Sequence, residues 1–181
     1  MISQRTKASI DSIASAALRE ALSSDFDCAV AVVDSDEISA SMAVMLTVSS
    51  YDFRMTILLH FTLDDAIRGH FTDSEPEATH TGTNESCIDA ICERANIFCG
   101  GINRALALHY PHVGMSTPNV LESRCVHHIT ELNVGHVRHF RINIANKVSM
   151  HASLCICAFA EMDFEIGSEA EQPNNGELEM F

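Results

Sequence analysis

Apolar residues recur along this chain with two different periods. From about Gln4 to Leu22 they fall at three- and four-residue steps, which is the spacing of a helix with one buried side. From Ile38 to Val48, and again from Phe53 to Phe61, they occupy every second position, as in strands that bury one face. The short polar turn at 49–52 joins these two segments, so the pattern predicts a long antiparallel hairpin.

The same order of helix and hairpin returns in the second half. Asp89 to Leu108 has helical spacing, and the alternating segments 137–146 and 148–159 predict two strands joined by a tight turn at Asn146-Lys147. The recurrence predicts a pseudo-two-fold repeat of structure, although no repeat of residues is visible. Because each hairpin has one apolar face and each helix one apolar side, we predict an α+β fold. Its long antiparallel hairpins form one sheet with the helices packed on one face.

Shorter segments complete the prediction. Cys28 to Val33 is an apolar run of strand length, and Met115 to Leu121 is an extended piece entered through a proline. Leu63 to Phe71 predicts a short helix. Asp73 to Ser86 consists largely of short polar residues without a period, so we predict a loop there.

The chain is acidic, with 25 Asp and Glu against 11 Lys and Arg among its 181 residues. Part of the excess lies in 161–181, which holds seven acidic residues and no basic one. We predict one domain over 1–160, followed by a disordered acidic tail over 161–181. No cluster of Lys and Arg is present to follow a phosphate backbone, so the sequence argues against nucleic-acid binding.

Membrane and secretory features are also lacking in the sequence. The longest apolar runs are far below the roughly 20 residues needed to span a bilayer, and the N-terminal stretch has no secretory apolar region. We therefore expect a cytoplasmic protein without membrane association. The seven cysteines are an odd number and lie mostly inside apolar patterns, so we expect free thiols.

The predicted central helix carries unusual polar and small residues outside its apolar stripe. Glu93 and Asn96 are three positions apart, so they point the same way from neighbouring turns. Gly100 and Gly101 follow one turn later, and a glycine inside a helix costs about 1 kcal/mol relative to alanine. Close approach by another backbone is a natural reason for keeping them. An ordinary solvated helix face with a glycine packing notch fits the same residues.

Two other kinds of site find less support. The chain has ten histidines and seven cysteines that could bind a metal, but the spacings between them do not match a compact ligand motif such as Cys-x-x-Cys or His-x-x-x-His. The histidines and cysteines considered are His127, His128, His136, His139, His151, Cys87, Cys92, Cys99, Cys155 and Cys157. No serine or cysteine nucleophile is visibly paired with a base, and phosphate-loop and dinucleotide-binding patterns are absent. We predict no metal site and no cofactor bound by this chain.

The central stretch resembles the signature of a known family. Asp89, Glu93 and Asn96 fit the pattern of the CheC/CheX/FliY family of bacterial chemotaxis phosphatases, and CheX within it. That pattern is Asp or Ser, three residues, Glu, two residues, Asn, and a proline about two dozen residues later. Gly100 and Pro118 complete the match, which covers only about 30 residues. The order of helices and hairpins is compatible throughout.

The resemblance implies a phosphatase that removes the aspartyl phosphate of a CheY-type receiver. Such a receiver already holds the phosphate and a Mg²⁺ ion, so the phosphatase need only place a water in line. By analogy with the family, Asn96 would insert its amide and orient that water, and Glu93 would pair with a lysine of the receiver. Asp89 would support the same contact, and Gly100 would allow the helix to approach closely.

The number of Glu-x-x-Asn motifs indicates which members of the family this chain resembles. CheC-type proteins carry the Glu-x-x-Asn motif twice, whereas the first helix here has none, so one site per chain is expected. CheX-like proteins also tend to pair through their sheets, which implies a homodimer. A function of another class stays open, namely a non-catalytic CheX-like module that binds a receiver or scaffold protein. A metal-dependent sensor is a third, weaker alternative.

Overall fold

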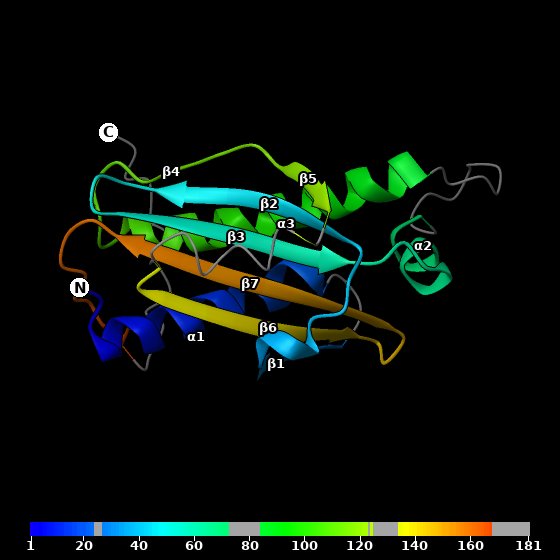
Figure 1. Cartoon of the computed structure of the whole chain (residues 1–181), viewed down its shortest axis with the longest axis horizontal. Coiled ribbons are helices and arrows are strands. Elements are labelled where there is room, and N and C mark those ends of the chain that lie inside the picture. Colours follow the sequence, from blue (N-terminus) through cyan, green and yellow to red (C-terminus); the bar gives the residue numbers. More distant parts are fainter. Residues whose placement is uncertain (24–26, 73–83, 123, 125–133, 168–181) are drawn as a thin grey trace, which may run out of the picture.

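The alternating segments pair into one seven-stranded sheet in the computed structural model, which describes residues 1–23, 27–72, 84–122, 124 and 134–167 (Figure 1). The strands are β1 (Cys28–Val33), β2 (Met42–Ser49), β3 (Phe53–Phe61), β4 (Gly114–Met115), β5 (Asn119–Glu122), β6 (His136–Ile144) and β7 (Val148–Ala158). Their order is β1-β6-β7-β3-β2-β4, and β5 also pairs with β2. Every strand pair is antiparallel, as the sequence predicts.

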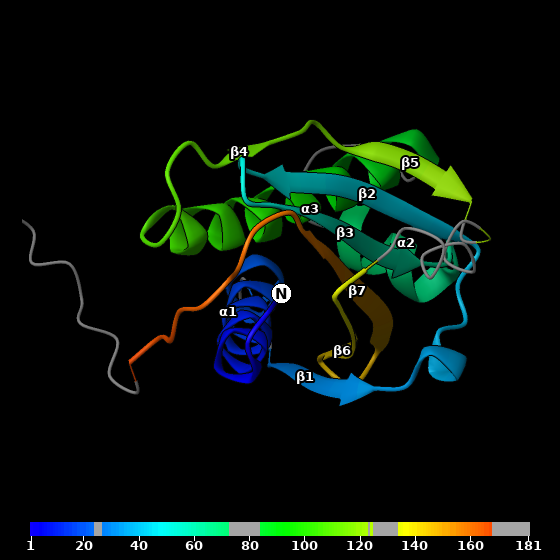
Figure 2. The ribbon, with the colours of Figure 1, turned by 60° about the vertical axis from the view of Figure 1, so that its left-hand side comes forward.

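Two long helices cover one face of this sheet. They are α1 (Gln4–Leu22) and α3 (Asn84–Ala107), and both lie behind the strands in Figure 1. In Figure 2 the twisted sheet curves around α1. A short helix, α2 (Asp65–Thr72), packs near α3, and a 3-10 turn, η1 (Ser35–Glu37), follows β1. The predicted α+β fold, one antiparallel sheet with helices gathered on one face, is confirmed.

The strand order contains the predicted two-fold repeat. The two long hairpins, β2-β3 and β6-β7, meet at the centre through the pair β3-β7. The strand that precedes each hairpin joins the other half, because β1 pairs with β6 and β5 pairs with β2. Each half therefore supplies one long helix, one exchanged strand and one hairpin, which makes α1 and α3 equivalent elements of the repeat.

The core lies between the sheet and the two long helices. The inward positions of β3 are Phe53, Met55, Ile57, Leu59 and Phe61, and all are at most 1% exposed. They belong to one hydrophobic cluster with Ile10, Ala14 and Leu18, which lie on the buried side of α1. The helix begins where the Ser3 hydroxyl accepts a hydrogen bond from the Thr6 N–H, a normal helix cap.

Two element boundaries differ from the prediction. Residues 38–41 alternate like a strand but lie outside β2, because β3 ends at Phe61, the partner of Met42, and offers residues 38–41 no partner. The capping box of η1 between Asp34 and Glu37 holds the preceding turn instead. The central helix also begins earlier than predicted, at Asn84, so residues 84–86 belong to α3 rather than to the loop predicted at 73–86.

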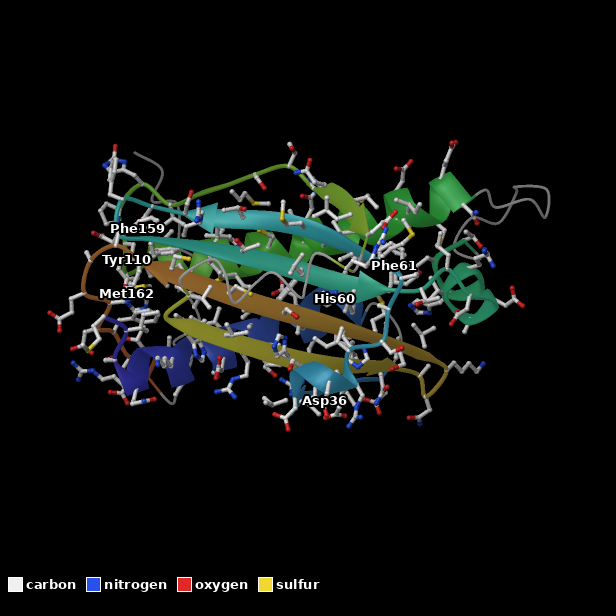
Figure 3. The ribbon with its side chains drawn as sticks, in the orientation of Figure 1. Asp36, His60, Phe61, Tyr110, Phe159 and Met162 are labelled. Atoms are coloured by element: carbon white, nitrogen blue, oxygen red, sulfur yellow. The ribbon has the colours of Figure 1, made fainter. Side chains whose placement is uncertain are left out.

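The segment after β7 packs along α1. The Thr6 hydroxyl donates to the carbonyl of Phe164 and accepts from its N–H, and the Ser9 hydroxyl accepts from the Ile166 N–H. Met162 is fully buried, and Figure 3 shows it at the same end of the molecule as Tyr110. The packed domain therefore reaches at least Ile166, beyond the boundary predicted at 160. The remainder of the predicted tail, 168–181, lies outside the described residues.

The sheet face turned away from the helices carries a buried polar cluster. His60 is marked on the sheet in Figure 3, where this face is the front one. The Ser153 hydroxyl lies 2.9 Å from Nε2 of His60 and 2.8 Å from Nδ1 of His139. Both His60 and Ser153 are fully buried.

Among the described helices, none is long and apolar enough to cross a membrane.

Candidate active site

The central helix α3 is held on three sides by the rest of the domain. Its buried side consists of residues at three- and four-residue steps, as the helical spacing predicts: Cys87, Ile91, Ala95, Phe98, Cys99, Ile102 and Leu106. On one flank it meets α1, where Arg94 Nη1 donates to the carbonyl of Ala21 at 3.4 Å. Near its N-terminus, Arg68 of α2 donates to the Asn84 side chain at 3.2 Å. These contacts fix which side of α3 faces solvent.

The residues predicted to form the site share this outward side. Asp89 and Glu93 are exposed, whereas Asn96 and Gly100 are half-buried. With 3.6 residues per turn, Asn96 lies about 60° around the helix from Glu93, away from α1. Neither the Glu93 nor the Asn96 side chain makes a hydrogen bond or ion pair with another described residue. One carboxylate and one amide are therefore free to bind an external partner.

The two glycines of α3 serve different surroundings. A methyl group at position 101 would lie 3.0 Å from the Ala17 Cβ of α1, so Gly101 allows the two helices to pack closely. A methyl group at position 100 would meet only Nη1 of Arg104, at 3.6 Å, the end of a flexible side chain. The packing notch considered in the sequence analysis is thus real at Gly101. At position 100, by contrast, packing within the domain does not require a glycine.

Substitution of each glycine should separate these roles. Gly100→Ala is expected to raise the free energy of unfolding by up to about 1 kcal/mol, because alanine is the better helix former. Gly101→Val is expected to lower it by about 1–3 kcal/mol, because its methyl groups overpack against α1. Urea unfolding followed by circular dichroism measures both. An increase in stability from Gly101→Val would show that α1 yields readily and that the notch does not constrain the helix pair.

A groove of about 990 Å³ lies between α1 and α3, but it does not coincide with the predicted site. Its walls include Ala16 and Ala17 of α1 and Gly101, Arg104 and Leu108 at the end of α3. Asp89, Glu93 and Asn96 do not line it. The residues predicted to form the site therefore lie on a convex helix surface, which suits a macromolecular partner better than a small ligand.

The described residues do not support the two alternatives, a metal site and a cysteine nucleophile. No three His, Cys, Asp or Glu side chains there come together in a way that would hold a metal ion. His127 and His128 lie outside the described residues. Burial raises the pKa of the Cys99 and Cys155 thiols to about 12, which disfavours the nucleophilic thiolate. None of the described cysteines forms a disulfide.

The architecture matches solved structures despite low sequence identity. A chemotactic CheC-like protein from Shewanella oneidensis MR-1 is 11% identical, with a TM-score of 0.58 over 83% of this chain and 96% of that chain. CheX from Vibrio vulnificus is 15% identical, with a TM-score of 0.54 over 82% and 96%. The CheX–CheY–BeF3–Mg²⁺ complex from Borrelia burgdorferi gives 12%, 0.57, 82% and 96%. This chain has a CheC-like fold.

No protein-family model matches the sequence, and no match is found among curated proteins. The CheC-like fold is nevertheless the one that the residue motif implies. Within this fold α1 and α3 are equivalent by the repeat, yet only α3 carries the Glu-x-x-Asn pair. Pro118, the last part of the motif, is half-buried in the connection between β4 and β5 at the sheet edge.

One charged residue on the candidate surface had no role in the sequence analysis. Arg104 lies two turns beyond Asn96 on α3, and its side chain is 67% exposed. Its guanidinium lies over both glycines, with Nη1 3.6 Å from a methyl group built at Gly100. The sequence shows an arginine near the end of a helix, which is commonplace. Only the packing of α3 against α1 shows where this guanidinium lies.

Proposed function

We propose that this protein is a CheX-type phosphatase that hydrolyses the aspartyl phosphate of a CheY-type receiver. The observation that supports the proposal best is the pair Glu93 and Asn96. Both side chains are without a partner among the described residues and lie on the outward side of α3, in a CheC-like fold. One structure with this fold is a complex of CheX with CheY. A free carboxylate and amide at this spacing have no evident structural task.

The proposed task of Asn96 is to position the attacking water. A neutral amide donates and accepts hydrogen bonds, so it holds a water without adding charge beside a phosphoryl group. Phosphoryl transfer needs little covalent help from the protein and responds strongly to alignment of the nucleophile. The water attacks phosphorus in line with the bond to the receiver's aspartate. That bond breaks, and inorganic phosphate and a free carboxylate result.

Glu93 is proposed to dock the helix by pairing with a lysine at the active site of the receiver. It is one of three acidic side chains in the first half of α3, with Glu85 and Asp89, and this grouping favours a cationic partner. The Mg²⁺ ion of the reaction belongs to the receiver, where it neutralises charge on the transferred group. This chain is proposed to bind no cofactor of its own.

Removal of the Glu93 charge should affect docking more than chemistry. Glu93→Gln keeps the shape of the side chain and is expected to raise the KM for a phosphorylated receiver by about tenfold, because one interprotein charge pair is lost. The turnover number at saturation should change much less. Initial rates measured over a range of receiver concentrations test this. A reduced turnover number with an unchanged KM would place Glu93 in the chemical step instead.

We also propose a cytoplasmic homodimer joined through the sheet. Within the described ranges, β1 pairs with β6 on one edge and with no strand on the other. An unpaired edge strand rich in alanine and valine is a natural site for strand pairing between copies. Light scattering across a range of protein concentrations tests this, and a mass of one chain throughout would exclude the dimer.

The second candidate function is a CheX-like module that binds a receiver without hydrolysis. One assay separates the two functions. Phosphorylated receivers are incubated with and without the protein, and the loss of radiolabelled phosphate is followed. Faster loss for at least one receiver supports the phosphatase. Saturable binding to a receiver whose phosphate decays at the spontaneous rate supports the binding module.

A further inference from the structure

Arg104 occupies the part of α3 that a docked partner would cover. Its Nη1 lies 3.6 Å from a methyl group built at Gly100, and Nη2 lies 4.0 Å from one built at Gly101. Its only ion pair among the described residues is with Glu20 of α1, at 3.5 Å. The side chains of this pair are 67% and 65% exposed, and exposed pairs of this kind contribute little to stability. The guanidinium can therefore change partners at small cost.

The helix geometry aligns Arg104 with Glu93. Eleven positions separate the two residues, which is three full turns and about 20° of rotation. They therefore lie on nearly one line along the outward side of α3, about 16 Å apart. A standard protein interface covers about 800 Å² on each partner, which spans such a distance. A receiver seated over Glu93, Asn96 and Gly100 reaches Arg104 as well.

The charges on this line have opposite signs. Glu85, Asp89 and Glu93 make the first half of the exposed surface acidic. The other arginine of α3, Arg94, is half-buried and turned toward the Ala21 carbonyl of α1. Arg104 is thus the exposed cation on α3, and it follows the acidic half at a fixed distance. Such a surface favours a partner that presents a cation and then an anion along the same line.

We propose that Arg104 is a second docking residue that selects among receivers by pairing with a carboxylate on the receiver surface. The proposal rests on the proposed function and adds to it the chemistry of the preferred substrate. That receiver carries an acidic side chain about 16 Å from the lysine that Glu93 meets. Arginine suits this task, because its planar fork binds a carboxylate through two hydrogen bonds.

Arg104 could instead have a structural role, in which its ion pair with Glu20 links α3 to α1. The two roles predict different effects of Glu20→Gln. If the bridge to Glu20 mattered, Glu20→Gln would reproduce the effect of changing Arg104. If Arg104 contacts the receiver, Glu20→Gln releases the guanidinium and leaves the KM unchanged or lower. This variant therefore separates a positioning effect within the domain from a contact with the partner.

The test compares Arg104→Glu with Lys147→Glu, an equal change of charge in the exposed turn between β6 and β7. Initial rates are measured over a range of phosphorylated receiver at low salt, where such pairs are least screened. We expect Arg104→Glu to raise KM about tenfold or more, with the turnover number within about twofold of wild type. Lys147→Glu should leave both constants within about twofold.

Charge reversal on the receiver completes the test. Surface carboxylates of the receiver are changed one at a time to lysine, and one of them should restore a low KM to Arg104→Glu. The inference is overturned if wild type is active and Arg104→Glu keeps the wild-type KM, or if Glu20→Gln matches its effect. If wild type itself does not speed phosphate loss from any receiver, the proposed function fails. That result is distinct from failure at Arg104 alone.

Discussion

Asn96→Ala is expected to slow dephosphorylation of the receiver by about 100-fold or more, toward the spontaneous rate. The reason is that misplacing a reacting group by about 1 Å is enough to cost this much, and alanine leaves the water with no partner on α3. The fold should not suffer, because the Asn96 side chain makes no hydrogen bond with another described residue. Alanine is also the better helix former.

The measurement is the turnover number from radiolabelled phosphate loss, with urea unfolding measured on the same samples. Asn103→Ala is the matched control, because it removes the same amide from α3 two turns further along. Asn103 should not touch the water, so this variant should keep most of the activity. Its stability is measured separately, since Oδ1 of Asn103 is buried without a partner among the described residues.

Two outcomes would contradict the assignment. If Asn96→Ala unfolds, the asparagine has a structural task and the outward side of α3 has been misassigned. If Asn96→Ala folds and keeps the wild-type turnover number, the water is positioned by another group. A higher KM with the same turnover number would reduce Asn96 to a docking residue, and the proposed mechanism would lose its central step.

The sequence alone predicted the elements of this fold, but not how the two halves interlock. Period-two alternation in 53–61 and 148–159 reports one buried face, and both segments form the expected strands. Nothing in that pattern says which edge a short strand joins. The pairing of β1 with β6 and of β5 with β2 depends on the packing of the whole sheet. Residues 38–41 show the same limit, because alternation without a partner strand makes no strand.

The same limit applies to the candidate site: relations within one helix could be predicted from the sequence, whereas contacts between elements could not. Spacing along one helix was enough to place Asp89, Glu93 and Asn96 on a common side, because that relation is local. The different surroundings of Gly100 and Gly101 were beyond local reasoning, since only the position of Ala17 in α1 distinguishes them. The packing of 161–166 on α1 was hidden for a related reason. Its acidic composition resembles a tail, and its anchors are hydrogen bonds to residues far away in sequence.

Stability should fall sharply as the pH drops below about 6.5, because of the buried cluster on the outer face of the sheet. Burial, together with smaller contributions from the nearby His151 and His139, lowers the pKa of His60 to about 4. Nδ1 of His60 is buried and has no hydrogen-bond partner among the described residues, so a proton placed there has no acceptor. Burial also lowers the pKa of His139 and of His151.

The sign follows from comparing the folded and unfolded chains. An unfolded histidine takes up a proton near pH 6.5, whereas folded His60 stays neutral until about pH 4. Between these values the unfolded state binds more protons, so the free energy of unfolding falls by about 1.4 kcal/mol per pH unit. The loss from His60 alone reaches about 3 kcal/mol near pH 4. His139 and His151 add to it in the same direction.

Urea unfolding at pH 7 and at pH 4.5, on wild type and on His60→Gln, measures this loss. Glutamine retains an N–H that can donate to the Ser153 hydroxyl but does not titrate, so the difference between the two pH values should shrink by about 2 kcal/mol. His112→Gln, at an exposed position after α3, is the control for removing a histidine elsewhere in the chain. Asp163 does not confuse the result, because its hydrogen bond with Arg5 lowers its pKa to about 2, and the stability that this contributes is lost only below the unfolded carboxyl pKa of about 3.9. If His60→Gln and wild type lose stability equally between pH 7 and pH 4.5, the acid sensitivity arises from another group.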